Sequence, residues 1–326
     1  MKQHLRLVSS NGSRASRRSA SDSGAPVASG LRALVAPVDL TPHSDRALGR
    51  IPLLPLANAA RVTLLHVVPG GLTHREQRMA ERDAHKALAA EVRHLRQQVS
   101  RKVRIESEVR TGNIAAEIAA CVAEREAELI VMGRGGGRPV RDMFLGSTAE
   151  RVTRQARMPV LVVRLAPRSQ YTRPALGLDL DETADAVVRL MLRVLRPPRP
   201  SLDIVHAFDA PYRSMVYPSL PQAEADERKH ELRAQATQSL ASVLAAALAK
   251  ASVRPEDVPL WRTHVRYGAP RLVLEKFVEK ADTDLLMLGT HAHSGLAYVL
   301  LGTVAGDVLR AAKCDVLIVP PASVRP

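Results

Sequence analysis

Leu34-Val35-Ala36-Pro37-Val38-Asp39 is a short apolar run that ends on a carboxylate, and Leu176-Gly177-Leu178-Asp179 repeats it 140 residues later. A second run, VTLLHVV at 62–68, returns at the same offset as LDIVHAF at 202–208. Repetition at a fixed offset is the signature of a duplicated structural unit. The chain is therefore expected to contain two copies of one fold.

Four further matches follow at an offset of 156, so one insertion of 16 residues lies between the second and third strands of the second copy. The pairs are Val109–Gly112 with Val265–Gly268, Met132-Gly133 with Leu288-Gly289, Leu145–Ser147 with Leu301–Thr303, and Val160–Val163 with Val316–Val319. All of them keep the same order along the chain.

Within each copy, short runs of Val, Ile and Leu alternate with longer amphipathic stretches. Apolar runs of this length are typical of strands buried on both faces of a parallel sheet. The pattern predicts an α/β fold of two tandem domains, each with five parallel strands and helices on both faces. The helices are expected at 73–99, 113–125, 148–156, 223–251 and 270–280. Pro52 and Pro55 fall where the first helix should run, so that helix is expected to be kinked or to start late.

The 326 residues divide into a basic tail at 1–30, expected to be disordered, a first domain at 31–167, a linker at 168–172 and a second domain at 173–322. The tail is rich in Ser, Arg, Gly and Ala and lacks apolar periodicity. No segment has the run of about 20 apolar residues that a membrane-spanning helix needs. Two unpaired cysteines indicate neither a disulfide framework nor a Cys-based zinc site, so a cytoplasmic protein is expected.

The net charge of +14 raises the question of nucleic-acid binding. The excess is concentrated in the tail (+4) and in residues 31–167 (+8), against +2 for the remainder. Only nine residues are aromatic, which leaves little for stacking on bases. Nucleic acid is therefore an unlikely main partner, although a basic protein that binds nucleic acid or acidic partners stays an alternative.

A glycine-rich loop follows the fourth strand of the first copy. Gly133-Arg134-Gly135-Gly136-Gly137-Arg138 leads to Gly146-Ser147-Thr148 at the start of a helix, which gives the spacing G-x2-G-x9-G-S. Glycines allow positive φ and a close approach of the backbone to a ligand. Backbone N–H groups in the loop and at the helix start can bind phosphate oxygens. Asp39 ends the first strand at the same edge of the sheet, where a carboxylate can accept bonds from a ribose hydroxyl.

Each piece also has a structural interpretation, since a glycine cluster can be a flexible turn and Asp39 a helix cap. The chain has no Walker A motif, and no G-x-G-x-x-G follows the first strand, so neither a P-loop NTPase nor a dinucleotide-binding enzyme is indicated. The placement of the loop and of Asp39 on one edge of one sheet favours nucleotide binding.

Together, the loop motif, the strand-end Asp39, the VTLLHV run and the closing PVLVV strand resemble the universal stress protein family in its tandem form. The resemblance implies a Rossmann-like fold of the adenine nucleotide alpha hydrolase type, with the two domains paired through their last strands and a homodimer as a further option. It implies a stress-response or regulatory module that binds ATP, with or without Mg²⁺. The residues it implies for the nucleotide site are Pro37, Val38, Asp39, Val67, Met132, Gly133, Arg134, Gly136, Gly146, Ser147 and Thr148.

The second copy departs from this motif. Ala292 stands where the second glycine belongs, and Asp181 and Glu182 bring carboxylates to the loop where the first copy has Thr41 and Pro42. The first copy is therefore expected to bind ATP more tightly. A weaker site in the second copy would consist of Asp179, Ala207, Gly289, Thr290, Ala292, Gly302 and Thr303.

No catalytic residue is assigned, because no general base or carboxylate pair for metal binding stands beside the loop. A slow ATPase or another adenine-nucleotide-dependent enzyme of this fold is the alternative function. His291 and His293 lack a third metal ligand at a suitable spacing, so no metal site is expected. His66 and His206 are expected in the core or at its rim, and Cys121 as a small buried apolar side chain.

Overall fold

Each copy of the repeat forms five parallel strands in the computed structural model, which describes residues 30–135, 146–181, 183–209, 222–251, 253–290 and 302–321. The first copy contributes β1 (Leu31–Pro37), β2 (Leu56–Pro69), β3 (Arg104–Gly112), β4 (Leu129–Gly133) and β5 (Val160–Val163). The second contributes β6 (Pro174–Gly177), β7 (Leu202–Phe208), β8 (Trp261–Tyr267), β9 (Leu285–Gly289) and β10 (Asp315–Val319). All ten join in one sheet in the order β3-β2-β1-β4-β5-β10-β9-β6-β7-β8.

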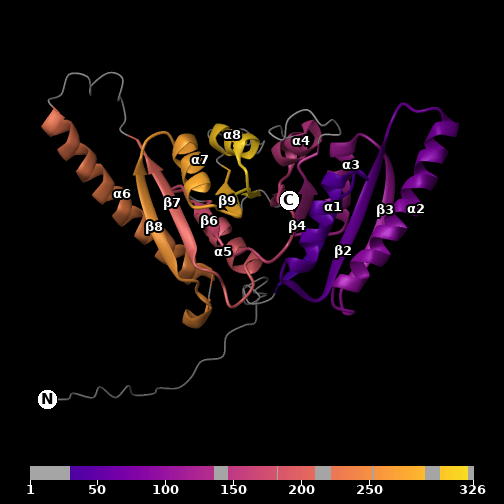
Figure 1. The fold of residues 1–326 in the computed structure, drawn as a ribbon, viewed down its shortest axis with the longest axis horizontal. Helices are drawn as coiled ribbons and strands as arrows, with labels where there is room; N and C mark the ends of the chain where they lie inside the picture. The colour runs from indigo at the N-terminus through magenta and orange to yellow at the C-terminus, as the bar shows by residue number, and fades with distance from the viewer. Residues whose placement is uncertain are drawn as a thin grey trace, which may run out of the picture.

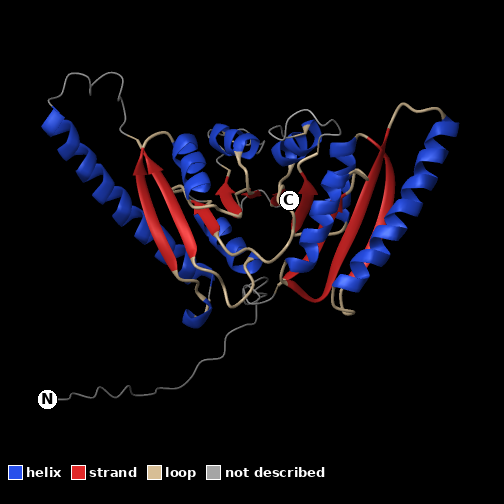
Figure 2. Cartoon of the chain, in the orientation of Figure 1, coloured by secondary structure: helices blue, strands red, loops and turns tan. Residues whose placement is uncertain are grey.

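The helices cover both faces of this sheet (Figure 1 and Figure 2). They are α1 (Pro42–Arg50), α2 (His74–Gln98), α3 (Ile114–Glu124), α4 (Ser147–Gln155), α5 (Ala184–Val194), α6 (Gln222–Ala251), α7 (Pro270–Lys280) and α8 (Thr303–Ala311). The buried residues of α1, α2, α5 and α6 belong to one apolar cluster, and those of α3, α4, α7 and α8 to the other. No helix in the described ranges is long and apolar enough to cross a membrane.

The central strands are apolar because both of their faces are covered. Every residue of β4, β5, β6 and β10 is buried, as expected for a parallel sheet between two helical layers. The expected α/β fold with tandem five-stranded units is confirmed. The structure adds that the two units share one sheet.

The first helix differs from its prediction. It neither kinks nor starts late: α1 begins at Pro42 and ends at Arg50, and Pro52 lies in a 3-10 turn, Ile51–Leu53, that follows it. Proline removes a backbone donor that a helix interior needs, so the helix stops before Pro52. β2 then begins at Leu56, six residues before the apolar run at Val62.

The extra residues of the second copy fall between β7 and β8. Part of the insertion lies in 210–221, outside the described residues, and part extends α6 to 30 residues against 25 for α2. Figure 1 places these two long helices at opposite ends of the molecule.

The last strands of the two copies pair with each other. β10 runs antiparallel to β5, with Val316 opposite Val162 and Ile318 opposite Val160. The amino end of β10 therefore lies beside the carboxyl end of β5. Asp315, the first residue of β10, is fully buried at this point.

The Asp315 carboxylate joins the two copies through four interactions. Its Oδ1 accepts from the backbone N–H groups of Arg164 (2.7 Å) and Leu165 (2.8 Å). Its Oδ2 accepts from the Tyr171 hydroxyl (2.8 Å) and lies 3.3 Å from Nε of Arg50. The Arg50 guanidinium in turn stacks 4.2 Å from the centre of the Tyr171 ring.

Asp315 has no symmetric counterpart, since Pro159 stands at its position in the first copy. Burial raises the pKa of Asp315, although the backbone donors, Arg50 and Tyr171 oppose the shift. A raised pKa in the folded state means that the ionised carboxylate costs folding free energy as the pH rises through that pKa. The network therefore serves to fix the junction of the two copies more than to add net stability.

Replacing only one member of the Arg50–Asp315 ion pair should lower the free energy of unfolding more than replacing both. We expect Asp315→Leu to lower the free energy of unfolding by about 3–5 kcal/mol, because it leaves the Arg50 charge buried and uncompensated. The double variant Arg50→Met/Asp315→Leu should recover part of that loss, because neither buried charge remains while the Arg164, Leu165 and Tyr171 donors still lack their acceptor. Urea denaturation measures both, and a double variant no more stable than Asp315→Leu would contradict this account.

Candidate functional site

The predicted site residues of the first copy lie along one edge of the sheet. Pro37 ends β1, Val67 lies near the end of β2, and Met132-Gly133 end β4. These three strands are neighbours in the order β2-β1-β4. The parallel sheet thus brings residues far apart in the sequence to one carboxyl edge, where open α/β sheets bind ligands.

Asp39 is exposed at the end of β1 and holds the start of α1. Its Oδ1 accepts from the Thr41 N–H (3.1 Å), the Thr41 hydroxyl (2.6 Å) and the Ser44 hydroxyl. This oxygen therefore holds the turn that leads into α1, and within the described part of the chain it accepts from no backbone N–H of the helix itself. Oδ2 has no hydrogen-bond partner among the described residues and remains available as an acceptor.

The His66 side chain ends the backbone hydrogen bonding between β1 and β2 one bond early. The Val38 N–H donates to the Leu65 carbonyl at 2.8 Å, so in a continued parallel ladder the Val38 carbonyl would accept from the Val67 N–H. Instead, the ring Nδ1 of His66 lies 2.8 Å from that carbonyl oxygen. The described residues supply no backbone acceptor for the Val67 N–H.

The same device occurs in the second copy. Nδ1 of His206 lies 2.9 Å from the Leu178 carbonyl oxygen, where a continued ladder would place the Ala207 N–H. Each ring bonds to a carbonyl 28 residues earlier in the chain. The prediction of a core or rim position for both histidines did not include this role, because the sequence does not show which backbone group a ring meets.

The glycine-rich loop is closed at its base. The Gly146 N–H donates to the Arg134 carbonyl at 2.8 Å, which ties the end of β4 to the start of α4. Gly135 has φ +66°, a conformation that favours glycine. The motif assigned Gly133 and Gly136, so Gly135 is a position that spacing alone missed. Gly136 lies outside the described residues.

The start of α4 carries backbone donors without a side-chain cap. Gly146 is the N-cap residue and has no side chain to accept a bond, and Ser147 and Thr148 form the first turn. By contrast, Thr73 caps α2 and Asn113 caps α3 through their side chains. An uncapped helix start presents N–H groups and the positive end of the helix dipole to an anion.

Two arginines at the ends of neighbouring strands add positive charge beside this loop. Arg134 follows β4 and Arg164 follows β5, and Arg164 is buried. Burial lowers the pKa of Arg164, and the nearby Arg134 charge lowers it further. The Arg164 guanidinium donates to the Leu309 carbonyl of α8, so the base of the loop also contacts the second copy.

The corresponding edge of the second copy is closely packed at Gly289. A Cβ on Gly289 would lie 2.4 Å from the Thr183 hydroxyl, so this glycine allows α5 to pack against the end of β9. The Asp181 carboxylate accepts from Thr183 and brings negative charge to the same loop.

The remaining predicted residues of that edge keep the expected order. Asp179 is exposed and Thr290 is buried. Gly302 and Thr303 open α8 as Gly146 and Ser147 open α4. Ala292 lies outside the described residues, as do His291 and His293.

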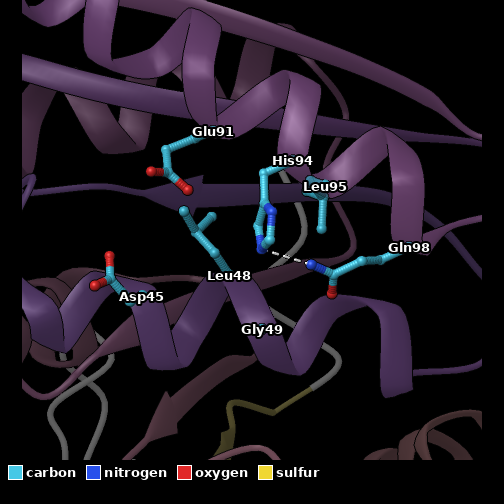
Figure 3. A pocket seen from close by; sticks show the side chains of 7 residues that line it. All are labelled: Asp45, Leu48, Gly49, Glu91, His94, Leu95 and Gln98. Carbon is cyan, nitrogen blue, oxygen red and sulfur yellow. Dashed lines mark hydrogen bonds between the residues drawn. The ribbon is translucent and has the colours of Figure 1, made fainter.

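A separate hollow of about 390 Å³ lies between α1 and α2 (Figure 3). Asp45 and Glu91 project into it from the two helices, and His94 lies 2.7 Å from the Gln98 amide nitrogen. Leu48, Gly49 and Leu95 complete its lining. Its two carboxylates would repel an anionic ligand, so the hollow does not suit a nucleotide. The described residues contain no group of three potential metal ligands.

Comparison with known proteins identifies the relatives of this chain. The family model described as "Universal stress protein family" matches residues 30–164 and 171–320. Universal stress protein Rv2005c of Mycobacterium tuberculosis is 30% identical over 204 residues, which are 59% of this chain and 62% of that relative. The chain thus spans less than two thirds of that relative's length. Universal stress protein A homolog 1 of Coxiella burnetii is 28% identical over 149 residues, 46% of this chain and 96% of the relative.

Solved structures share the fold across both copies. A universal stress protein from Archaeoglobus fulgidus superposes with a TM-score of 0.63 at 17% identity, covering 89% of this chain and 98% of that one. The functionally unknown protein PA1789 of Pseudomonas aeruginosa gives a TM-score of 0.60 at 16% identity, covering 90% and 94%. At these sequence identities, the two superpositions show a shared fold only.

The role of His66 can be tested without a ligand. We expect His66→Leu to slow hydrogen exchange of the Val67 amide roughly fivefold, because the freed Val38 carbonyl can then accept from it and a net backbone bond is worth about 1 kcal/mol. The Leu65 amide, inside the ladder, is the reference. His206→Leu should slow hydrogen exchange of the Ala207 amide and leave that of the Val67 amide unchanged. An unchanged exchange rate of the Val67 amide in His66→Leu would show that the ring does not displace the backbone bond from Val67 to Val38.

Proposed function

The chain belongs to the universal stress protein family, and on that premise we propose that its first copy binds an adenine nucleotide, ATP, as a stress-response or regulatory module. The observation that carries the proposal is the closed Arg134–Gly146 loop next to an uncapped helix start. Glycine-rich loops that lead into a helix N-terminus are a common means of binding phosphate through backbone donors.

The phosphates would lie at the start of α4. The N–H groups of Ser147 and Thr148 have no side-chain cap to satisfy them, and Arg134 adds a charge at the other end of the closed loop. Gly135 and Gly146 keep the backbone bare where the phosphates would pass. Mg²⁺, if it accompanies the nucleotide, would be held through the phosphates.

The adenine would lie against the end of β2. The main chain of Val67 points toward β1, but His66 occupies the carbonyl that its N–H would otherwise meet. A base edge offers acceptor nitrogens to such a donor, and Val38 and Met132, both buried and apolar, would flank the ring. The unused Val67 N–H therefore supports the backbone contact that the family resemblance implies.

The ribose would be held by Asp39. Because Oδ1 already accepts from Thr41 and Ser44, the contact falls to Oδ2. This division lets one carboxylate fix the start of the helix and accept from a ribose hydroxyl at the same time.

The second copy would bind nucleotide more weakly or not at all. Its Asp181 carboxylate lies in the loop after β6, and Thr183 takes the space over Gly289. A negative charge near the phosphates opposes an anionic ligand. We expect one tightly bound nucleotide per chain.

Asp39→Asn separates the two roles of this side chain. The amide oxygen can still accept from Thr41 and Ser44, but the negative charge that a ribose hydroxyl would meet is lost. We expect ATP affinity in titration calorimetry to fall about tenfold, since a hydrogen bond to a charged group contributes about 1.5–3 kcal/mol. Binding of inorganic tripolyphosphate should not change. Asp179→Asn is the matched control and should leave ATP affinity unaltered, whereas equal losses for both ligands would contradict the ribose contact.

Gly135→Val tests the loop itself. A side chain at φ +66° strains the backbone by about 1–2 kcal/mol and would lie 3.7 Å from Gly146, so ATP affinity should fall tenfold or more, by about 1.4 kcal/mol. Gly71→Val is the control, since Gly71 has φ +90° with open space around it and lies away from the loop. Both variants should lose stability, but only Gly135→Val should bind ATP more weakly. Retained affinity in Gly135→Val would overturn the proposed phosphate site.

A further inference from the structure

The outward face of α2 carries a row of positively charged side chains. Arg75, Arg78, Arg82, Lys86 and Arg93 are all exposed, and together they are called the basic stripe. Their spacings of 3, 4, 4 and 7 residues place them on one side of a helix. The opposite side buries Ala84, Leu88, Val92 and Leu95 against the sheet.

The stripe is long and straight. Arg75 and Arg93 are 18 residues apart, which corresponds to about 27 Å along a helix. Arg101 and Lys102 lie exposed in the turn just beyond the end of α2. Figure 1 shows α2 at one end of the molecule, with no other described element outside it.

None of the five stripe cations lies within ion-pair distance of a carboxylate among the described residues. Two nearby acidic residues of α2 bond elsewhere: Glu76 accepts from Thr73 in the capping box, and Glu81 accepts from Gln77 and Thr111. Glu81 still lies close enough to Arg78 for their charges to interact, and Asp83 is exposed next to Arg82. The stripe therefore presents five cations without ion-pair partners, flanked by these two carboxylates.

The equivalent helix of the second copy is different. In α6, Arg228 pairs with Glu231 at 2.9 Å, and Lys250 pairs with Asp185 of α5. The C-terminal part of α6 is rich in alanine, from Ala245 to Ala249. Since α2 and α6 occupy equivalent places in the repeat, the stripe is a property of the first copy and not of the fold.

We propose that the basic stripe binds the phosphodiester backbone of a nucleic acid, independently of base sequence. A row of cations one helical turn apart matches a linear polyanion with regularly spaced charges. The stripe contains no aromatic side chain for stacking, so it would contact phosphates and leave the bases unread. The low aromatic content made nucleic acid an unlikely main partner on sequence grounds, but contacts to phosphates alone do not need aromatic side chains.

A nucleic acid fits the stripe better than a membrane or an acidic protein. Peripheral helices enter a membrane by an apolar face, but the apolar face of α2 is buried in the core. A protein interface needs an apolar centre, and the exposed large apolar side chains on or beside α2 in the described residues are Leu72 and Met79.

The test measures binding of the full chain to labelled RNA and duplex DNA of mixed sequence by fluorescence anisotropy. Five phosphate contacts predict a slope of log K against log salt of about −4.5 for a duplex and about −3.5 for a single strand. Duplex affinity should then fall roughly 500-fold between 50 and 200 mM salt. The triple variant Arg82→Gln/Lys86→Gln/Arg93→Gln should reduce the magnitude of the duplex slope by about 2.7. Glutamine keeps helix propensity at these exposed positions, so the fold should be retained.

A matched variant removes the same charge from α6: Arg228→Gln/Lys229→Gln/Arg233→Gln. It should leave the salt slope unchanged, because a specific stripe and not net charge governs binding. Equal losses in the two triple variants would overturn the proposal, as would binding that disappears on deletion of residues 1–29 but survives in the α2 triple variant. Stripe-dependent binding to phosphatidylserine vesicles without binding to RNA or DNA would also overturn it, in favour of a membrane surface.

Discussion

The antiparallel pairing of β5 with β10 is the constraint on which the rest of the molecule depends. It turns two repeats into one sheet, so that the two apolar clusters run continuously across both copies. The same pairing places the amino end of β10 beside the carboxyl end of β5. Asp315 is thereby buried next to Arg164, close to the edge where the first copy has its glycine-rich loop.

This junction breaks the symmetry of the duplication. Pro159 has no donor or charge to offer at the equivalent position, whereas Asp315 gathers Arg50, Tyr171 and two backbone donors. The buried network lies on the side of the first copy, which is also the copy with the intact loop motif. The two repeats thus share an architecture and differ in the chemistry of their edges.

The same asymmetry extends to the surface. The loop that leads into α1 has Thr41 where the loop that leads into α5 has Asp181. The outward face of α2 is a row of cations without ion-pair partners among the described residues, while α6 pairs Arg228 and Lys250 with carboxylates. Duplication supplied two copies of the scaffold, and the first copy holds the features suited to anionic ligands, both nucleotide phosphates and a phosphodiester backbone.

The sequence by itself determined the duplicated α/β fold, because strand-length apolar runs and amphipathic stretches recur at fixed offsets. It also located the glycine loop, since glycine spacing is a local property. It misplaced the first helix, where Pro52 ends α1 early. Only the tertiary structure showed that the His66 ring takes the Val38 carbonyl and that Oδ1 of Asp39 is already in use. It also showed that Asp315 is buried at the junction and that the charges of α2 lack partners. These properties depend on which groups meet across strands and copies, and such contacts arise from packing at distances that no local sequence pattern encodes.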